Sequence, residues 1–275
     1  TNKYTHKFLN DPDAKRRIED EGIGYSMTGL VAQIKEKYFA HTEEGVTIKL
    51  ADSYGFCWGV ERAVQMCYEA RKQYPTKEIW ITNEIIHNPT VNMRLSEMGV
   101  NFIQETDGVK NFNPVKSESV VILPAFGASI DEMKLLADIG VMIVDTTCPW
   151  VSRVWNSVDR HARKQFTSII HGKFEHEETI ATASFAKTYL VVKDIKEARW
   201  VCDYILNRGA TKTEFMRKFK NAHSDGFDPV KDLDAVGVAN QTTMLKGETE
   251  AIGKLFERTM MEKYGVQNLG KHYFV

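Results

Sequence analysis

Cysteine is scarce in this chain, and no C-x-x-C pair occurs. The 275 residues contain four cysteines, which are Cys57, Cys67, Cys148 and Cys202. Thiols this few and scattered exclude a disulfide framework and favour a reducing compartment. The missing C-x-x-C argues against a locally built zinc site. Long apolar runs are also missing, because the longest are the size of a strand, whereas a membrane-spanning helix needs about 20 apolar residues.

The chain also lacks an excess of charge of either sign. Lys and Arg number 36 and Asp and Glu number 37, which leaves a formal net charge of −1. Nucleic-acid binding and polybasic membrane anchoring both need surplus cations, so the composition argues against both kinds of partner. Apolar residues make up 43%, enough for a core, and the length suggests two domains of roughly 100–150 residues each.

Short β-branched runs alternate with helical patterns along most of the chain. We expect strands at 46–50, 78–82, 100–103, 120–123, 141–144, 167–170, 189–192 and 235–239. We expect helices at 60–73, 89–98, 129–138, 151–164, 177–185, 195–206 and 249–263. This alternation predicts right-handed βαβ crossovers, and therefore an α/β fold with parallel sheets.

The alternating pattern divides into two modules. We expect residues 46–148 to form a first α/β module and residues 149–275 a second. The stretch 207–233 interrupts the second module, because it is long, charged and carries Gly226 and Pro229. It predicts a helical insertion followed by a loop.

Residues 1–45 precede the first strand of the pattern and predict an N-terminal extension. We expect helices within it at 14–21 and 27–38. Its opening stretch is polar and has no apolar core of a signal peptide. The first residue is Thr1 rather than Met, which suggests a processed or trimmed start.

Thiol and unusual polar side chains follow directly on predicted strands. These residues are Cys57, His87, Phe126, Cys148, His171, His176 and the triplet Gln241–Thr243. Ligands of parallel α/β sheets bind beyond the carboxyl ends of the strands. We therefore expect these side chains to converge on one rim and form an active site.

Two of the thiols occupy turns that suit a ligand. Cys57 stands between Gly55 and Gly59, where the backbone can approach a bulky group. Cys148 precedes Pro149, which heads a predicted helix, and a thiol at a helix N-terminus is a ready thiolate ligand or nucleophile. Soft thiolates select zinc, Cu(I) or iron–sulfur clusters. The alternative is that each thiol is a small buried hydrophobe, an interpretation we keep for the two thiols inside predicted helices.

A second polar cluster follows the strand at 167–170. The segment His171–Thr182 places two histidines, a lysine and three glutamates within twelve positions. Histidine and lysine suit a phosphate-like anion, and a carboxylate beside them suits proton transfer. The alternative is a charged surface turn. Gln241–Thr243 adds hydroxyl and amide donors that can position a substrate oxygen.

Taken together, these motifs resemble the 4-hydroxy-3-methylbut-2-enyl diphosphate reductase family. The matching segments are Gly55–Ala63, Glu84–Asn88, Asp145–Pro149, His176–Glu178 and Gln241–Thr243. They occur in the family's order between residue 46 and about residue 270. The extension at 2–38, with EGIGYSMTGL inside it, and the stretch 79–89 look like the plant, algal and cyanobacterial branch.

The resemblance implies a cofactor. The family binds an iron–sulfur cluster of the 4Fe–4S type through three cysteines, and the motifs assign Cys57 and Cys148 to two of these positions. The family has three similar α/β modules around a central cluster, of which this chain supplies two. The third cysteine would therefore lie beyond residue 275, and we expect a longer protein.

The resemblance also implies roles for other residues. His87 and His176 would hold the diphosphate, Glu178 would deliver the proton, and Thr242 would orient the substrate hydroxyl or a proton relay. Where bacterial members have a further phosphate-binding histidine, this chain has Phe126, as the plant-like branch does.

The implied activity is reductive removal of the hydroxyl of 4-hydroxy-3-methylbut-2-enyl diphosphate, which gives isopentenyl and dimethylallyl diphosphate in the non-mevalonate isoprenoid pathway. The resemblance implies ferredoxin as electron donor and a plastid stroma, or the cytoplasm if the source is cyanobacterial; a homodimer and a larger assembly both stay open. One alternative is a non-catalytic relative that serves as a binding or scaffold subunit of a larger plastid assembly, since fold does not fix function. Another is a phosphate-binding α/β enzyme with a catalytic thiol.

Overall fold

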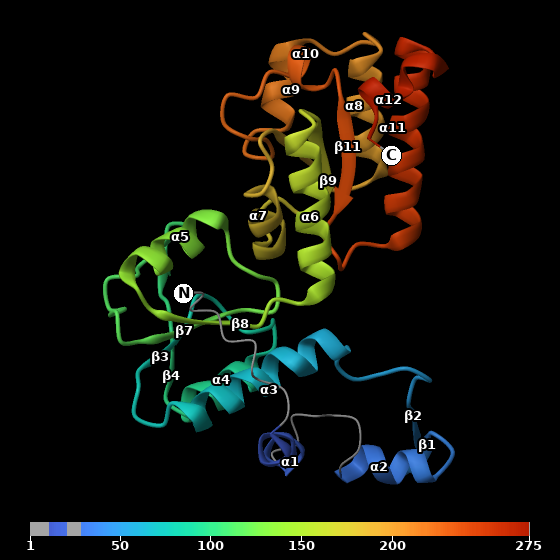
Figure 1. The fold of residues 1–275 in the computed structure, drawn as a ribbon. Coiled ribbons are helices and arrows are strands. Elements are labelled where there is room, and N and C mark those ends of the chain that lie inside the picture. The colour runs from blue at the N-terminus through green and yellow to red at the C-terminus, as the bar shows by residue number, and fades with distance from the viewer. Residues whose placement is uncertain (1–10, 21–28, 275) are drawn as a thin grey trace. The chain divides into compact units, whose positions relative to one another are not determined.

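The computed structural model describes residues 11–20 and 29–274 (Figure 1). The chain divides into unit 1, with residues 1–125 and 135–148, and unit 2, with residues 126–134 and 149–275. Helix α5 (Ile130–Ile139) is shared between them. The main sheet of each unit is parallel, so the predicted α/β fold is confirmed.

The described part of unit 1 begins with two helices and a hairpin and then alternates helices with the strands of its main sheet. Its helices are α1 (Pro12–Asp20), α2 (Gly29–Glu36), α3 (Trp58–Gln73) and α4 (Pro89–Glu97). Its strands are β1 (Ala40–Glu43), β2 (Val46–Lys49), β3 (Ile79–Ile81), β4 (Val100–Phe102), β5 (Glu105–Thr106), β6 (Val109–Lys110), β7 (Val120–Leu123) and β8 (Met142–Asp145). The expected helices at 14–21 and 27–38 correspond to α1 and α2. Residues 21 and 27–28 of those predictions, and most of EGIGYSMTGL, lie outside the described residues.

The main sheet of unit 1 has the strand order β4-β3-β7-β8, with every neighbouring pair parallel. All four residues of β7 are buried, as expected for a strand that helices cover on both faces. Helix α3 begins directly after Cys57 and packs against α4, and α1 lies on α3. Met66 and Cys67 of α3 share a core cluster with Ile81 and Ile122 of the sheet.

The strand expected at 46–50 does not join this sheet. As β2 it pairs antiparallel with β1 in a hairpin whose β2 residues are all exposed. The turn residues Glu44 and Gly45 have φ of 47° and 81°, the positive values of a tight hairpin turn. The strand that Cys57 follows along the chain therefore does not belong to the parallel sheet, and that expectation is wrong. Cys57 is positioned instead as the residue before α3.

Unit 2 continues the alternation. Its helices are α6 (Pro149–Arg163), α7 (Glu177–Ala183), α8 (Ile195–Ile205), α9 (Lys212–Lys218), α10 (Pro229–Asp232), α11 (Lys246–Tyr264), the 3₁₀ helix η1 (Val266–Asn268) and α12 (Leu269–His272). Its strands are β9 (Thr167–His171), β10 (Tyr189–Val192) and β11 (Val236–Asn240). They form a parallel sheet in the order β10-β9-β11.

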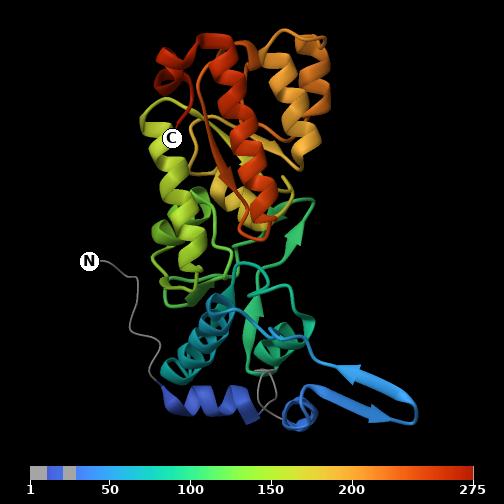
Figure 2. The ribbon, with the colours of Figure 1, turned by 90° about the vertical axis from the view of Figure 1, so that its right-hand side faces the viewer.

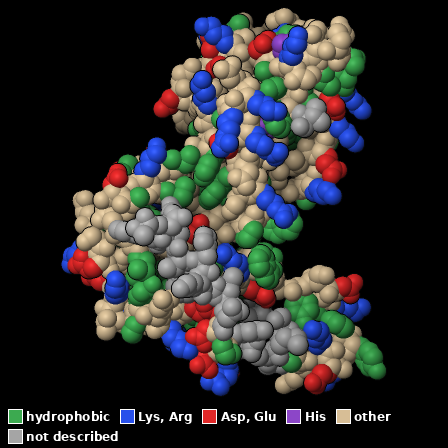
Figure 3. Space-filling view, viewed as in Figure 1, with side chains coloured by type: hydrophobic (Ala, Val, Ile, Leu, Met, Phe, Trp, Pro, Cys, Tyr) green, Lys and Arg blue, Asp and Glu red, His purple; other side chains and the backbone are tan. Residues whose placement is uncertain are grey.

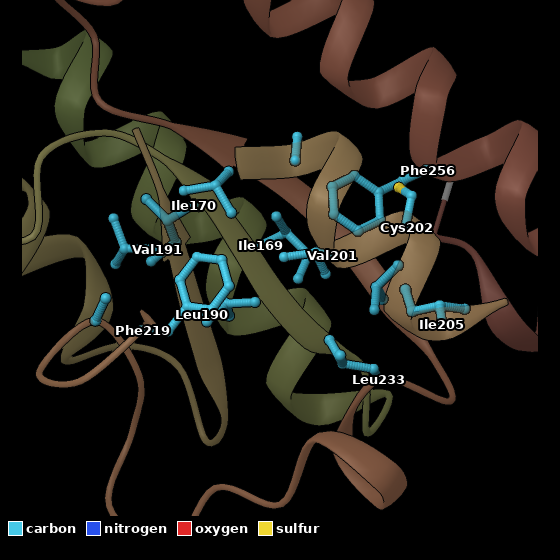
Figure 4. Packing of buried hydrophobic residues seen from close by; sticks show 14 of the residues in the cluster. Ile169, Ile170, Leu190, Val191, Val201, Cys202, Ile205, Phe219, Leu233 and Phe256 are labelled. Carbon is cyan, nitrogen blue, oxygen red and sulfur yellow. The ribbon is translucent and has the colours of Figure 1, made fainter. Parts of the chain in front are cut away.

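Helices cover both faces of the unit 2 sheet. Figure 2 shows α6 on one side of β11 and α8 with α11 on the other. The core between the sheet and α8 and α11 is apolar, and Figure 4 shows Val201 and Phe256 packed among residues of β9 and β10. Residues 207–233 do form helices, as expected, yet they also fill the core, since Phe215 of α9 is fully buried.

The surface carries charges of both signs. Figure 3 shows acidic and basic side chains interspersed on the face it presents, with Lys and Arg gathered over α6. Arg153 of α6 stacks on Trp150, with its guanidinium carbon 4.3 Å from the ring centroid. Among the helices that the structure describes, none is long and apolar enough to cross a membrane.

Candidate active site

Two thiols meet beside a glycine in unit 1. Cys57 is the residue before α3, and Cys148 follows β8 and precedes α6. A Cβ placed on Gly59 would lie 2.5 Å from Cys148 Sγ and 3.9 Å from Cys57 Sγ. The two sulfurs are therefore no more than about 6.4 Å apart, which is the sum of those two distances. Gly59 is required here because any side chain would fill the space that the sulfurs border.

The turn that carries Cys148 is held by hydrogen bonds to the last residue of β7 and to Ala125, two residues beyond it. The backbone N–H of Cys148 donates to the carbonyl of Ala125 at 2.8 Å. The hydroxyl of Thr146 donates to the carbonyl of Leu123 at 2.5 Å. These bonds fix the backbone from which the thiol projects, so its direction depends on the sheet rather than on a flexible loop.

Arg62 connects the two cysteine turns, a role that the sequence analysis missed. Its guanidinium, on α3, donates to the carbonyls of Thr146 at 3.3 Å and Thr147 at 3.2 Å. The helix that begins after Cys57 is thereby tied to the turn that ends in Cys148. The sequence did offer one signal for this role. Arg62 lies in the same motif as Cys57, a little over one helical turn further along the chain.

The exposure of the thiols fits a ligand at this pair. Cys57 is exposed and Cys148 is half-buried, whereas Cys67 and Cys202 are buried. Burial raises the pKa of the Cys67 thiol and raises the pKa of Cys202 to about 12, which keeps both protonated and unreactive. Two convergent thiols beside open space fit two positions of a soft metal centre. Within residues 11–20 and 29–274, no group of three Cys, His, Asp or Glu side chains forms a complete site.

His87 lies in unit 1 in the turn before α4. Its Nδ1 is 3.0 Å from Glu84 Oε2, so the carboxylate orients the ring. The turn is shaped by Asn88, whose side chain accepts a hydrogen bond from the N–H of Val91 and caps α4. The His87 side chain is 56% exposed, which leaves it accessible to an anionic ligand.

His176 caps the start of α7 in unit 2. Its Nδ1 accepts a hydrogen bond from the backbone N–H of Glu178 at 3.1 Å. Because Nδ1 accepts, the proton of the neutral ring is assigned to Nε2, and Nε2–H is the group suited to an anion. Phe126 meets the imidazole edge-on, with ring centroids 6.3 Å apart, and therefore restricts the ring.

The buried carboxyl of Glu178 pairs with Thr242, which is itself exposed. The backbone N–H of Thr242 donates to Glu178 Oε1 at 2.5 Å, and its hydroxyl donates to Oε2 at 3.0 Å. Glu178 is only 3% exposed. Burial raises the pKa of this carboxyl, and the two Thr242 hydrogen bonds oppose the rise. A buried carboxyl that retains its proton is suited to general acid chemistry.

Two residues expected at the rim point inward instead. His171, the last residue of β9, is fully buried, and its Nδ1 lies 2.8 Å from Thr249 Oγ1. Burial lowers the pKa of His171, which favours its neutral form. Gln241 is also buried, and its amide bonds to protein groups rather than presenting donors to a substrate oxygen.

Within each unit the structure brings some of the expected residues close together. It brings Cys57 to Cys148 in unit 1, and His176, Glu178 and Thr242 together at the start of α7 in unit 2. That the two sets serve one ligand stays a prediction.

Comparison with known proteins agrees with the motifs. A family profile described as LytB protein matches residues 48–270. The chain belongs to the LytB family. It is 58% identical over 276 residues to the chloroplastic 4-hydroxy-3-methylbut-2-enyl diphosphate reductase of Botryococcus braunii, covering 100% of this chain and 55% of that protein. It is 63% identical over 246 residues to the enzyme of the same name from Crocosphaera subtropica, covering 90% of this chain and 61% of that protein.

The resemblance predicted from the sequence, including its chloroplast and cyanobacterial branch, is thus confirmed. The LytB chain spans a little more than half the length of these curated relatives. Its fold is similar to the solved E-1-hydroxy-2-methyl-but-2-enyl-4-diphosphate reductase from Plasmodium falciparum, with a TM-score of 0.56 and 21% identity, covering 78% of this chain and 55% of that one. At that identity the likeness concerns the fold alone.

Proposed function

We propose that this LytB protein reduces 4-hydroxy-3-methylbut-2-enyl diphosphate, removing its hydroxyl to give isopentenyl and dimethylallyl diphosphate. The observation that supports this most is the approach of two thiols to Gly59. Both sulfurs lie near this glycine, so one ligand of the size of a metal cluster could contact both thiols.

The proposed cofactor is a 4Fe–4S cluster with three cysteine ligands. Cys57 and Cys148 would hold two of its positions, and the third thiolate would come from outside this chain. When bound, such a cluster supplies electrons and a Lewis-acidic iron for the hydroxyl of the substrate. The residues of this chain would bind the diphosphate, orient the substrate hydroxyl and supply the proton.

His87 and His176 are the proposed diphosphate ligands. Each ring is oriented through Nδ1, by Glu84 in one case and by the α7 backbone in the other. The His176 ring, whose Nδ1 accepts, offers its Nε2–H to a phosphate oxygen with little loss of side-chain entropy. The His87 ring donates from Nδ1 to Glu84, so it donates from Nε2 as well only in its imidazolium form, which an adjacent phosphate favours.

Glu178 is the proposed proton donor, and Thr242 the residue that orients the substrate hydroxyl. Replacing C–OH by C–H and releasing water consumes two electrons and two protons, so the site needs an acid that is protonated at working pH. Burial raises the pKa of Glu178, which favours the protonated form of this carboxyl. The Thr242 hydroxyl already bonds to Glu178, so it is placed to relay a proton from the carboxyl.

The proposal extends to partners, location and organisation. The electron donor is ferredoxin, and the compartment is the plastid stroma, or the cytoplasm in a cyanobacterium; the chloroplastic and cyanobacterial relatives support both settings. The assembly is a homodimer or larger. Residues 1–45 are an extension, and 46–148 and 149–275 are two of three α/β modules.

The test is turnover by the protein expressed at its full natural length and purified without oxygen. Reduced ferredoxin and the substrate should yield both diphosphate products, which mass spectrometry resolves. The Glu178→Gln variant should keep its iron and lose at least about a hundredfold in kcat, the contribution of a general acid. Full iron content without turnover would refute the reductase, and a protein with neither iron nor turnover would point to the scaffold alternative.

A further inference from the structure

The side chain of Gln241 is buried among three segments of unit 2. It is 3% exposed. Its Oε1 accepts hydrogen bonds from the backbone N–H of Lys173 at 3.1 Å and from the hydroxyl of Thr179 at 3.2 Å. Its Nε2 donates to the hydroxyl of Thr243 at 2.7 Å. The amide orientation follows from these partners, since only an oxygen can accept from the Lys173 N–H.

The hydrogen bond between Gln241 and Thr179 joins the same two segments as the hydrogen bonds between Thr242 and Glu178. Glu178 and Thr179 are neighbours at the start of α7, and Gln241 and Thr242 are neighbours after β11. Two adjacent residues of one segment therefore bond to two adjacent residues of the other. The start of α7 therefore cannot move away from the loop after β11 without also breaking the bond between Gln241 and Thr179.

Gly172 lies close to both Thr179 and Gln241. A Cβ on Gly172 would lie 2.8 Å from Thr179 Oγ1 and 3.1 Å from Gln241 Cβ. The backbone N–H of Gln241 also donates to the carbonyl of His171 at 2.8 Å. The amide therefore has no room to swing, and one rotamer is fixed by packing on every side.

We propose that Gln241 is a positioning residue that holds the start of α7 against the loop after β11 and so fixes the contact between Glu178 and Thr242. It acts through its neighbours rather than on a substrate. The inference rests on the proposed function only for the role of Glu178 as proton donor, because the geometric part concerns the protein alone.

Loss of the amide has a defined physical consequence. In Gln241→Leu the N–H of Lys173 and the hydroxyl of Thr179 lose their buried acceptor, so the two segments separate until water reaches those donors. The N–H of Thr242 then no longer stays on Glu178. Since the Thr242 hydrogen bonds lower the pKa of Glu178 against the effect of burial, their loss moves that pKa upward.

The experiment is amide hydrogen exchange, resolved to Lys173 and Thr242, in the full-length protein kept without oxygen. In Gln241→Leu both amides should exchange at least about tenfold faster, because both lose their acceptor. Thr243→Val is the matched control, since it removes only the exposed partner of Nε2, and it should leave both amides unchanged. Gln241→Glu keeps an acceptor for both donors and should restore slow exchange.

Two further readouts separate positioning from general stability. In Gln241→Leu, kcat should fall about tenfold with KM nearly unchanged, and the basic limb of the pH profile should move to higher pH. If Gln241→Leu fails to fold, the Thr179→Val variant provides the test instead. It removes one of the two donors to Gln241 Oε1 and leaves the Gln241 side chain in place. Faster exchange at Lys173 alone, with Thr242 still protected, overturns the proposal. Exchange does not require turnover, so inactivity of every variant and of the parent protein would instead refute the proposed function.

Discussion

Thr242 donates hydrogen bonds to both carboxyl oxygens of Glu178, one from its backbone and one from its hydroxyl. The carboxyl is thus fully satisfied by one residue while almost no water reaches it. Burial still outweighs these two bonds, since the net effect is a raised pKa. A carboxyl with a raised pKa is less favourable in its charged form here than in water.

Glu178→Gln should stabilise the protein near pH 7. A carboxyl whose pKa is higher in the folded than in the unfolded state contributes stability at low pH and loses it as pH rises through the folded pKa. Glutamine keeps an acceptor and a donor for Thr242 and carries no charge. The free energy of unfolding of the variant should therefore exceed that of the parent at pH 7, and the difference should shrink as pH falls toward the ordinary range of a glutamate carboxyl. Thermal unfolding across that range measures this, and a less stable variant at pH 7 contradicts it.

Gly59→Ala should prevent cluster binding. Its Cβ would lie 2.5 Å from Cys148 Sγ, so that thiol must turn away from Cys57. Gly247→Ala is the matched control, because Gly247 lies in α11 with open space around it, and there alanine should stabilise the helix by about 0.5–1 kcal/mol. Iron analysis of anaerobically purified protein distinguishes the two. Iron content equal to the parent in Gly59→Ala would show that the space between the thiols is not needed.

Arg62→Leu should shorten the lifetime of the bound cluster. The variant loses both hydrogen bonds to the carbonyls of the Cys148 turn. Because a hydrogen bond to a charged group contributes about 1.5–3 kcal/mol, the rate of cluster loss on exposure to air should rise at least about tenfold. Arg16→Leu is the control, since Arg16 is exposed on α1 and pairs only loosely with Asp13. An unchanged rate in Arg62→Leu argues against the link between the two turns.

His161 should make unit 2 sensitive to acid. Burial lowers the pKa of this imidazole to about 4, and its Nδ1 lies 2.9 Å from the hydroxyl of Ser168. A group whose folded pKa is below its unfolded value contributes stability above the unfolded pKa and loses it as pH falls. The loss between pH 6.5 and pH 4 should reach about 3 kcal/mol, and His161→Gln should not show it. Denaturant unfolding at several pH values measures this; parallel curves for the two proteins would contradict it.

The bounds of strands were predicted best where a short apolar run lies between clear turn residues. Strands β7 and β10 have the predicted bounds, because each is an apolar run between clear turn signals. The hairpin of β1 and β2 was not foreseen. Val46–Lys49 has the composition of a sheet strand, and its pairing with Ala40–Glu43 follows from the turn at Glu44 and Gly45.

Site residues could be predicted from the sequence where short local motifs mark them. Glycine beside Cys57 and proline beside Cys148 marked the thiols, and the structure brings these two together. The contacts of Arg62 and Gln241 could not be predicted in this way, because they join segments distant in sequence. Gln241 was expected to face a substrate for the same reason. His171 was misjudged because its position at a strand end does not reveal which way its ring faces.

The central claim is that Cys57 and Cys148 bind a common iron centre. Its most direct measurement is the iron content and visible absorption of four single Cys→Ala variants, expressed at full natural length and purified without oxygen. Replacement of Cys57 or Cys148 should abolish both signals, whereas replacement of the buried Cys67 or Cys202 should leave them at the parent level. Retention of parental iron and colour by either of the first two variants would contradict the account.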